Sequence, residues 1–221
     1  MRHFVSILAV MMFMATHAQS SPSLNELMEQ AGLVDVGALN SAITVDLRYA
    51  TTDNFVGREM YGSLSRAYLT PETARSLLVA LTALKCVDEG YGFIIYDAAR
   101  PLSVQRIMWN CVKGTPNERY VARPHRGGPH NYGMAVDIGL TLNGEVVDMG
   151  TPFDTFNEAA HITAEASLVR RGLISAEARR NRELLRRVMT GAGFGTFSRE
   201  WWHFTRYKMP EARRRLRLLD F

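Results

Sequence analysis

The stretch "AVDIGLTLNGEVVDMG", residues 135–150, carries the clearest information about how this chain folds. Two apolar runs flank Asn143-Gly144, a dipeptide that strongly predicts a tight β-hairpin because the turn needs positive φ at both central residues. Helical patterns precede and follow this hairpin, so helices and strands are mixed along the chain. We therefore expect an α+β fold in one domain, with a small antiparallel or mixed sheet flanked by helices, rather than a doubly wound parallel sheet.

The segments around the hairpin predict further elements. Apolar alternation predicts a strand in "ITVDLRYA" (43–50), and a continuous apolar run predicts a buried strand in "YGFIIYD" (91–97). A last apolar strand is expected in "REWWHFTRY" (199–207). Start and stop signals predict helices from Ser23 to Gln30, from Pro71 to just before Gly90, from Pro101 to Gly114, and from about Ala176.

The first twenty residues, "MRHFVSILAVMMFMATHAQS", have the pattern of a secretory signal peptide: a basic start, a short apolar run and small residues near Ala18. The alternative is a membrane anchor, but the run falls short of the roughly 20 residues that a spanning helix needs. We expect residues 1–20 to be a signal peptide and residues 21–221 to form the functional domain. The mature protein is then periplasmic or secreted, with no stable membrane insertion.

The composition is that of a globular protein, with 47% hydrophobic and 22% charged residues and a formal net charge of +4. Much of the positive charge lies in residues 170–187 and near the C-terminus. Such runs form either solvated helix faces or surfaces that attract anionic partners. No nucleic-acid motif accompanies them, so we expect no nucleic-acid partner.

The two cysteines, Cys86 and Cys111, leave two interpretations open. In an oxidising compartment they can pair as a disulfide. Cys111 also continues an apolar stripe on its predicted helix, which predicts an inward-facing position, so two buried free thiols are the alternative. Two cysteines cannot supply a four-thiolate zinc site.

His130 and Asp137 bracket a glycine in "PHNYGMAVDIG" (129–139). On a straight strand, residues seven apart would be roughly 23 Å apart and on opposite faces. Ligand atoms that share one zinc ion are only ~3–4 Å apart, so the chain must turn between them, and Gly133 permits this. We expect His130 in a loop, a turn at Gly133, and a strand that carries Asp137. The alternative is a solvated histidine beside an unrelated aspartate.

Glu200 and His203 lie within the aromatic segment "REWWHF" (199–204), where both will be partly buried and need polar partners. His203 is either a core histidine bonded to a backbone carbonyl or a metal ligand. With His130 and Asp137 it would complete three N/O ligands, the arrangement of a catalytic zinc site with one Zn²⁺ per chain. Glu200 would then be the general base for water. Their spacing of three predicts a turn or bulge.

Arg100 lies in "YDAARP" (96–101), at the end of a predicted buried strand. An arginine there can stabilise an oxyanion with its fixed fork of donors. The alternative is that Arg100 pairs with Asp97 and only fixes the turn.

Three of these segments resemble the motifs of one family. "HNYGMAVD" (130–137), "EWWH" (200–203) and "YDAARP" are similar to the motifs of the zinc D-alanyl-D-alanine dipeptidases of peptidase family M15, the vancomycin-resistance type. The likeness continues through "VDLRYATTDNFVG", "MGTPFDTF" and "RRNRELLRRVMTGAGF". The resemblance implies zinc-dependent hydrolysis of the dipeptide D-Ala-D-Ala to two D-alanines. It implies these roles: zinc ligands His130, Asp137 and His203; catalytic base Glu200; transition-state stabiliser Arg100; ammonium anchor Asp154; and Tyr49 near the substrate carboxylate.

Two points depart from the family. Gly128 stands where the family usually has a serine, so any side-chain hydrogen bond made there to the substrate is missing, which bears on substrate affinity or preference. Export also differs from the cytoplasmic resistance enzymes, and suits recovery of D-alanine from wall peptides better than antibiotic resistance. The alternatives are a D,D- or L,D-carboxypeptidase acting on peptidoglycan peptides, against which Asp154 argues, and a non-enzymatic zinc module like the hedgehog signalling domain, against which Glu200 and Arg100 argue. No sequence feature indicates an oligomeric state.

Overall fold

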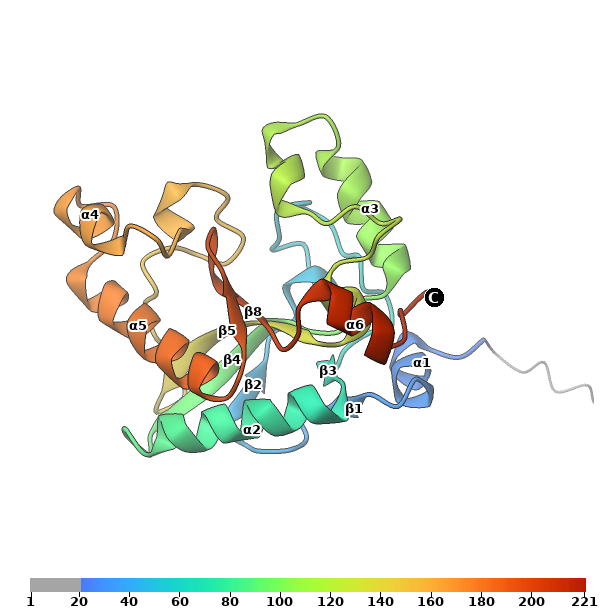
Figure 1. Ribbon diagram of the computed structural model, residues 1–221, viewed down its shortest axis with the longest axis horizontal. Helices are drawn as coiled ribbons and strands as arrows, with labels where there is room; N and C mark the ends of the chain where they lie inside the picture. The colour runs from blue at the N-terminus through green and yellow to red at the C-terminus, as the bar shows by residue number, and fades with distance from the viewer. Residues whose placement is uncertain (1–20) are drawn as a thin grey trace, which may run out of the picture.

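Strand β5 (Ala135–Leu142) lies in the middle of a six-stranded mixed sheet. The computed structural model describes residues 21–221 (Figure 1). Strand β5 pairs antiparallel with a neighbour on each side, whereas β2 and β4 pair parallel to each other. The remaining strands of this sheet are β2 (Ile43–Val45), β4 (Tyr91–Asp97), β6 (Glu145–Val146), β7 (Gly195–Phe197) and β8 (Glu200–Thr205). The order β2-β4-β5-β8-β7, with β6 added to β5, confirms the predicted α+β fold with a mixed sheet.

The predicted hairpin connects β5 to β6. Asn143 has φ 52° and Gly144 has φ 87°, so both central residues adopt the positive φ that this turn requires. Strand β6 is only two residues long and exposed, so the hairpin ends at the surface. The chain then leaves the sheet as a largely irregular segment, residues 147–160, in which the Thr151 hydroxyl accepts a hydrogen bond from Trp201 near the start of β8.

Helices α2 (Pro71–Lys85) and α5 (Ala176–Gly191) pack against each other and against the sheet (Figure 1). Helix α2 begins as predicted, because the Thr70 side chain accepts a hydrogen bond from the Thr73 amide and Pro71 is the first helical residue. Leu77, Leu81 and Leu84 of α2 are buried in the main hydrophobic core. The other helices are α1 (Leu24–Gln30), α3 (Leu102–Val112), α4 (Glu165–Arg170) and α6 (Met209–Arg215).

Short segments complete the fold and connect the main elements. Strands β1 (Val34–Asp35) and β3 (Tyr68–Leu69) form a separate two-stranded sheet. Four 3₁₀ segments lie between the longer elements, and they carry several of the residues that line the site described below. These segments are η1 (Arg48–Ala50), η2 (Pro116–Tyr120), η3 (Pro129–Tyr132) and η4 (Glu158–Ala160).

Two predictions about individual segments are wrong. Cys111 is exposed, as is Cys86, and both thiols are free, so neither the inward position nor a pair of buried thiols holds. The reason is that helix α3 is rotated to bury Val104, Met108 and Val112 at spacings of four. The strand predicted for residues 43–50 ends at Val45, because the chain turns into η1 and buries Tyr49.

The predicted signal peptide lies outside the described residues. Among residues 21–221, none of the helices combines the length and the apolar composition that crossing a membrane requires.

Candidate active site

One cavity of about 260 Å³ brings together all seven residues that the sequence singled out. They come from segments far apart in the chain: η1, the end of β4, η3, β5, the loop after β6, and β8. The cavity is smaller than the ~300–1,000 Å³ typical of sites for drug-sized ligands, so it suits a small substrate. The seven residues are Tyr49, Arg100, His130, Asp137, Asp154, Glu200 and His203.

The chain turns between His130 and Asp137 as expected. His130 lies in η3, and Gly133 ends that segment with φ 63°, a left-handed conformation that glycine adopts without strain. The Gly133 carbonyl accepts a hydrogen bond of 2.8 Å from the amide of Thr70, which fixes the turn against the start of α2. Strand β5 begins two residues later and carries Asp137 into the sheet.

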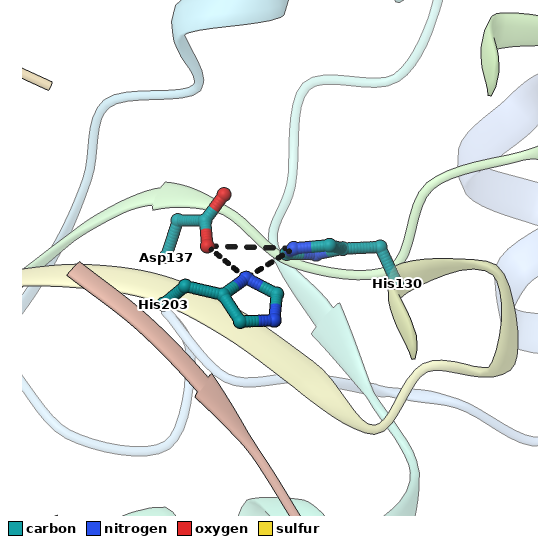
Figure 2. A group of neighbouring side chains, drawn as sticks. All are labelled: His130, Asp137 and His203. Atoms are coloured by element: carbon teal, nitrogen blue, oxygen red, sulfur yellow. Dashed lines mark hydrogen bonds and ion pairs between the residues drawn. The ribbon is translucent and has the colours of Figure 1, made fainter. Parts of the chain in front are cut away.

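Asp137 and His203 meet because they are directly opposite in the β5–β8 pairing. His203 Nδ1 lies 2.8 Å from Asp137 Oδ1, and His130 Nε2 lies 3.2 Å from His203 Nδ1 and 3.4 Å from Asp137 Oδ1. Figure 2 shows these three atoms converging on one point. One ligand atom from each residue lies within 4.8 Å of the other two. The structure therefore brings together the three residues that the sequence singled out as metal ligands.

The three side chains also fit a metal by their chemistry. His130 Nδ1 lies 2.7 Å from the carbonyl oxygen of Ala98, and donating a proton to that oxygen leaves the Nε2 lone pair facing the cluster. A backbone carbonyl behind a histidine is a common device for orienting a metal ligand. Two imidazoles and one carboxylate suit zinc and related transition metals better than magnesium or calcium. This donor set could hold one metal ion.

Without a metal, the cluster is a strongly interacting set of charges. Burial alone would raise the pKa of Asp137, but the two histidines outweigh it and hold that pKa well below its usual range. Burial favours the neutral form of His130, but the carboxylates of Asp137 and Asp97 outweigh it and raise the pKa of the imidazole. A cation is therefore stabilised at this point of the cavity, whether it is a proton or a metal ion.

Glu200 begins strand β8, where the pairing with β7 is irregular between Thr196 and Phe197. This irregularity is the bulge expected from the spacing of Glu200 and His203, and both side chains line the cavity. Glu200 Oε2 lies 3.9 Å from His203 Nδ1. Burial is the main cause that raises the pKa of Glu200 to about 8. A carboxylate with a raised pKa next to a group of potential metal ligands is suited to taking up a proton near neutral pH.

Arg100 both pairs with Asp97 and lines the cavity. Its Nε donates to Asp97 Oδ2 at 3.0 Å, its Nη2 contacts the same oxygen, and its Nη1 donates to Gln105 Oε1 at 2.9 Å. The pairing that the sequence offered as an alternative therefore exists, and it fixes the guanidinium at the cavity wall. Asp97 in turn is held by the Tyr61 hydroxyl and the Ala98 amide.

Asp154 and Tyr49 form the other end of the cavity. The Tyr49 hydroxyl lies 3.0 Å from each carboxylate oxygen of Asp154, and the Arg100 guanidinium carbon lies 5.1 Å from the centre of the Tyr49 ring. Asp154 keeps some accessible surface because it faces the cavity. Withdrawal from bulk water and the charge of Asp137 nevertheless raise the pKa of Asp154 well above its usual range. A cationic group entering the cavity would favour its ionised form.

Gly128 lines the same cavity, and its surroundings leave little room for a larger residue. A Cβ atom built on Gly128 would lie 2.8 Å from the Cβ atom of Ala122. The Gly128 amide donates to Asn131 Oδ1 at 2.7 Å. The glycine therefore allows the 121–122 segment to approach η3 closely.

Sequence reasoning missed an aromatic group over the cavity. Tyr120 of η2 stacks on Phe156 with ring centres 4.7 Å apart, and Phe156 lies 5.1 Å from Phe55. These three residues come from three different segments and all line the cavity. In the sequence, Phe55 is a lone aromatic residue in the segment "TTDNFVG" (51–57), and no local pattern links it to Tyr120 or Phe156.

Comparison with known proteins identifies relatives of the whole domain. Residues 29–218 match the peptidase M15 family, described as D-ala-D-ala dipeptidase. The D-alanyl-D-alanine dipeptidase of Escherichia coli (strain K12) is 32% identical over 181 residues, covering 81% of this chain and 86% of the relative. The D-alanyl-D-alanine dipeptidase of Enterococcus faecium is 33% identical over 180 residues, covering 72% and 83%. That of Streptomyces coelicolor is 29% identical over 195 residues, covering 79% and 91%.

Proposed function

Because the chain belongs to the peptidase M15 family of D-Ala-D-Ala dipeptidases, we propose that it hydrolyses D-Ala-D-Ala to two D-alanines in the cavity described above. We propose one zinc ion per chain, held by His130, Asp137 and His203. The observation that carries the proposal is that one small cavity holds two features. One is the group of three potential metal ligands, and the other, away from it, is the Asp154 carboxylate, which is shielded from bulk water. A free dipeptide offers a peptide carbonyl and an ammonium group to match them.

The metal would supply Lewis-acid chemistry, which lowers the pKa of a bound water toward about 7 and polarises a carbonyl. Glu200 accepts the proton of the attacking water and later donates it to the nitrogen of the leaving amine. Its pKa of about 8, set mainly by burial, favours both directions of this transfer near neutral pH. The bond between the carbonyl carbon and the peptide nitrogen breaks, and each product leaves as a free amino acid.

Arg100 stabilises the negative charge that develops on the carbonyl oxygen. Its guanidinium is held by Asp97 and Gln105, so it is oriented before the substrate arrives. A donor that is already in place loses little free energy to reorganisation during the reaction. In this proposal the ion pair with Asp97 orients Arg100 for catalysis, so the pairing and the catalytic role are compatible.

Asp154 binds the substrate ammonium, and Tyr49 supports it by donating to the carboxylate. In this proposal Tyr49 acts mainly by orienting Asp154, in addition to its predicted contact with the substrate carboxylate. The aromatic group formed by Phe55, Tyr120 and Phe156 lines the cavity. It limits the length of the substrate, because a longer peptide would have to extend past these three rings.

We also propose that the protein is exported and acts on dipeptides released from the cell wall. The signal-like segment at residues 1–20 supports this proposal. Recovery of D-alanine would be the physiological role of an exported dipeptidase.

The proposal is tested by incubating zinc-loaded protein with D-Ala-D-Ala and with N-acetyl-D-Ala-D-Ala, and assaying free D-alanine. The free dipeptide should be hydrolysed far faster, because acetylation removes the ammonium and adds bulk at Asp154. Equal rates on both substrates would overturn the dipeptidase proposal and favour a carboxypeptidase. Metal-depleted protein is the control, and it should release no D-alanine.

A further inference from the structure

Arg182 on α5 is buried although it carries a charge, with only 1% of its surface exposed. All three of its hydrogen bonds go to the irregular segment of residues 147–160, which we call the Asp154 loop. Nε donates to the Met149 carbonyl at 2.6 Å, Nη1 donates to the Ala159 carbonyl at 2.9 Å, and Nη2 donates to Thr151 Oγ1 at 3.4 Å. Burial lowers the pKa of Arg182 to about 10, so it remains protonated at neutral pH. For this residue, the expectation of a solvated basic face is wrong.

The Asp154 loop needs such an anchor for two reasons. Asp154 has φ 59°, a left-handed conformation that costs a non-glycine residue on the order of 1 kcal/mol and persists only where the surroundings fix it. Residues Val147 to Asp154 also line a second, more open cavity of about 860 Å³, so packing is weak on that side. Asp154 itself lines both cavities. A small movement of the loop could therefore turn its carboxylate from the first cavity into the second.

Two neighbours extend the contact between α5, the loop and the catalytic strand. Asn181 donates to the Asp148 carbonyl at 2.9 Å, and Trp201 Nε1 donates to Thr151 Oγ1 at 2.8 Å. The Arg182 guanidinium carbon also lies 5.7 Å from the centre of the Trp201 ring. Trp201 directly follows Glu200 in the chain. The same group of contacts thus holds the Asp154 loop against the segment that carries the proposed base.

We propose that Arg182 is a positioning residue that holds the Asp154 loop so that the Asp154 carboxylate faces the substrate ammonium. This inference rests on the proposed function, because it takes Asp154 as the ammonium acceptor. An arginine suits the task because its planar fork offers five donors with fixed directions. A lysine at the same place would reach one of the acceptors and leave the others without a donor.

A neighbouring arginine provides a matched control. Arg186 lies one turn further along α5 and forms a bidentate contact with Glu165, with oxygens at 2.7 and 3.3 Å. Glu165 also lies 4.0 Å from Arg182, so both arginines share one acidic partner. In the described part of the chain, the Arg186 guanidinium has no hydrogen bond to the Asp154 loop. Arg186→Met therefore removes a charge from the same helix and the same ion pair without releasing the loop.

The kinetic experiment compares Arg182→Met, Arg182→Lys and Arg186→Met with the parent enzyme on D-Ala-D-Ala and its N-acetylated form. Arg182→Met should lower kcat/KM for the free dipeptide roughly 10- to 100-fold, the loss expected for one misplaced charged hydrogen bond. It should lower kcat/KM for the blocked dipeptide much less, so the preference for a free amine shrinks. Zinc content should stay at one per chain. Arg182→Lys should recover part of the preference, and Arg186→Met should keep it.

A purely structural role predicts a different result. Arg182→Met would then lower the melting temperature and the amount of active enzyme, and both substrates would lose rate by the same factor. An unchanged preference for the free amine in well-folded Arg182→Met would overturn the inference. If Arg182→Met does not fold, Arg182→Lys and Thr151→Val decide. Thr151→Val keeps the shape but removes the oxygen shared by Arg182 and Trp201, so it too should reduce the preference.

Hydrogen exchange gives a readout that does not depend on the substrate. Amides of residues 149–160 should exchange at least roughly 10-fold faster in Arg182→Met than in Arg186→Met, because the local opening of the loop becomes easier. Equal exchange in the two variants would overturn the inference even if the parent enzyme proved to have another substrate. If instead the parent enzyme shows no preference for a free amine while the loop loosens as expected, the proposed function fails and the positioning of the loop stands.

Discussion

Asp137 and His203 stand on adjacent strands of a hydrogen-bonded sheet, whereas Asp154 stands on a loop between β6 and η4. The positions of Asp137 and His203, two of the three proposed metal ligands, follow from strand register, because residues that are directly opposite in an antiparallel pair have their Cβ atoms only ~4.5–5.5 Å apart. The position of Asp154 depends on a few side-chain contacts from Tyr49 and Arg182. We therefore expect the proposed metal end of the cavity to be rigid and the Asp154 end to be adjustable.

This difference has a consequence for function. Moving a strand residue by one position would turn its side chain to the other face of the sheet, so the metal cluster tolerates little change. A loop can change its length or its anchors while the sheet stays intact. We therefore expect changes at the metal end to abolish activity, and changes at the Asp154 end to alter which substrate is preferred.

The largest effect is expected from His203→Ala. This change removes one of the three proposed ligands, so the metal should be lost and hydrolysis of D-Ala-D-Ala should become undetectable. Metal analysis of the purified variant beside the parent protein checks this. A variant that keeps one zinc per chain would rule out His203 as a ligand and break the contrast between the two ends.

Glu200→Gln should lower kcat about 10²–10⁴-fold while zinc content stays unchanged. The amide keeps the shape of the side chain but cannot accept a proton, and a positioned base typically contributes a factor of that size. Steady-state kinetics with metal analysis on the same sample separates the two effects. Turnover near the parent rate would make Glu200 a structural residue.

At the loop end, Asp154→Asn should lower kcat/KM for D-Ala-D-Ala roughly 10- to 100-fold, because a hydrogen bond between charged partners contributes about 1.5–3 kcal/mol. The rate on N-acetyl-D-Ala-D-Ala should change little, because that substrate has no ammonium to lose. Kinetics on both substrates in both proteins measures the difference. If Asp154→Asn discriminates as well as the parent, the carboxylate only stabilises the loop.

The sequence predicted the rigid end of the cavity well, for physical reasons. The hairpin at Asn143-Gly144 and the turn at Gly133 are local features, since the residues themselves determine the positive φ values. Once β5 and β8 are recognised as strands, one antiparallel pairing brings Asp137 and His203 together. The motif resemblance singled out these two residues, and the register of the β5–β8 pairing places them directly opposite each other.

The adjustable end was less predictable, because it depends on contacts between distant segments. The turn of the chain into η1 follows from the burial of Tyr49 under Phe55 and Phe153, which no local pattern announces. In the sequence, nothing distinguishes Arg182 from the other arginines of a basic helix, and its contact with the Asp154 loop becomes visible only in the folded structure. The exposure of Cys111 depends on which side of α3 meets the core.

The metal-free protein should show an unusual dependence of stability on pH. Folding raises the pKa of Glu200 from an ordinary 4.5 to about 8, mainly through burial. The folded protein therefore holds this proton more tightly, and the stability that it contributes is fully present below pH 4.5 and lost as the pH rises through 8. The glutamine in Glu200→Gln cannot ionise, so at pH 9 the metal-free variant should have a higher melting temperature than the metal-free parent. The corresponding gain in the free energy of unfolding should be a few kcal/mol at most.

Melting curves of both proteins after chelation, at pH 5 and pH 9, test this expectation. His130 is present in both proteins, so its titration contributes equally to both melting temperatures and cancels in the comparison. Equal melting temperatures at pH 9 would mean that water reaches Glu200 and that this residue is less enclosed than its exposed fraction of 8% indicates.

The smallest effect is expected at Gly128, which also lines the cavity. Gly128 has φ −105°, so a serine causes no backbone strain there, and only space matters. Its Cβ atom would lie 2.8 Å from the Cβ atom of Ala122, so Gly128→Ser should destabilise the protein by about 1–3 kcal/mol, the usual cost of overpacking. Activity on D-Ala-D-Ala should not improve, because the segment that must move also borders the cavity. Combining Gly128→Ser with Ala122→Gly should restore the melting temperature and admit the hydroxyl. A single Gly128→Ser variant with parent stability and a lower KM would show that this border is as adjustable as the Asp154 loop.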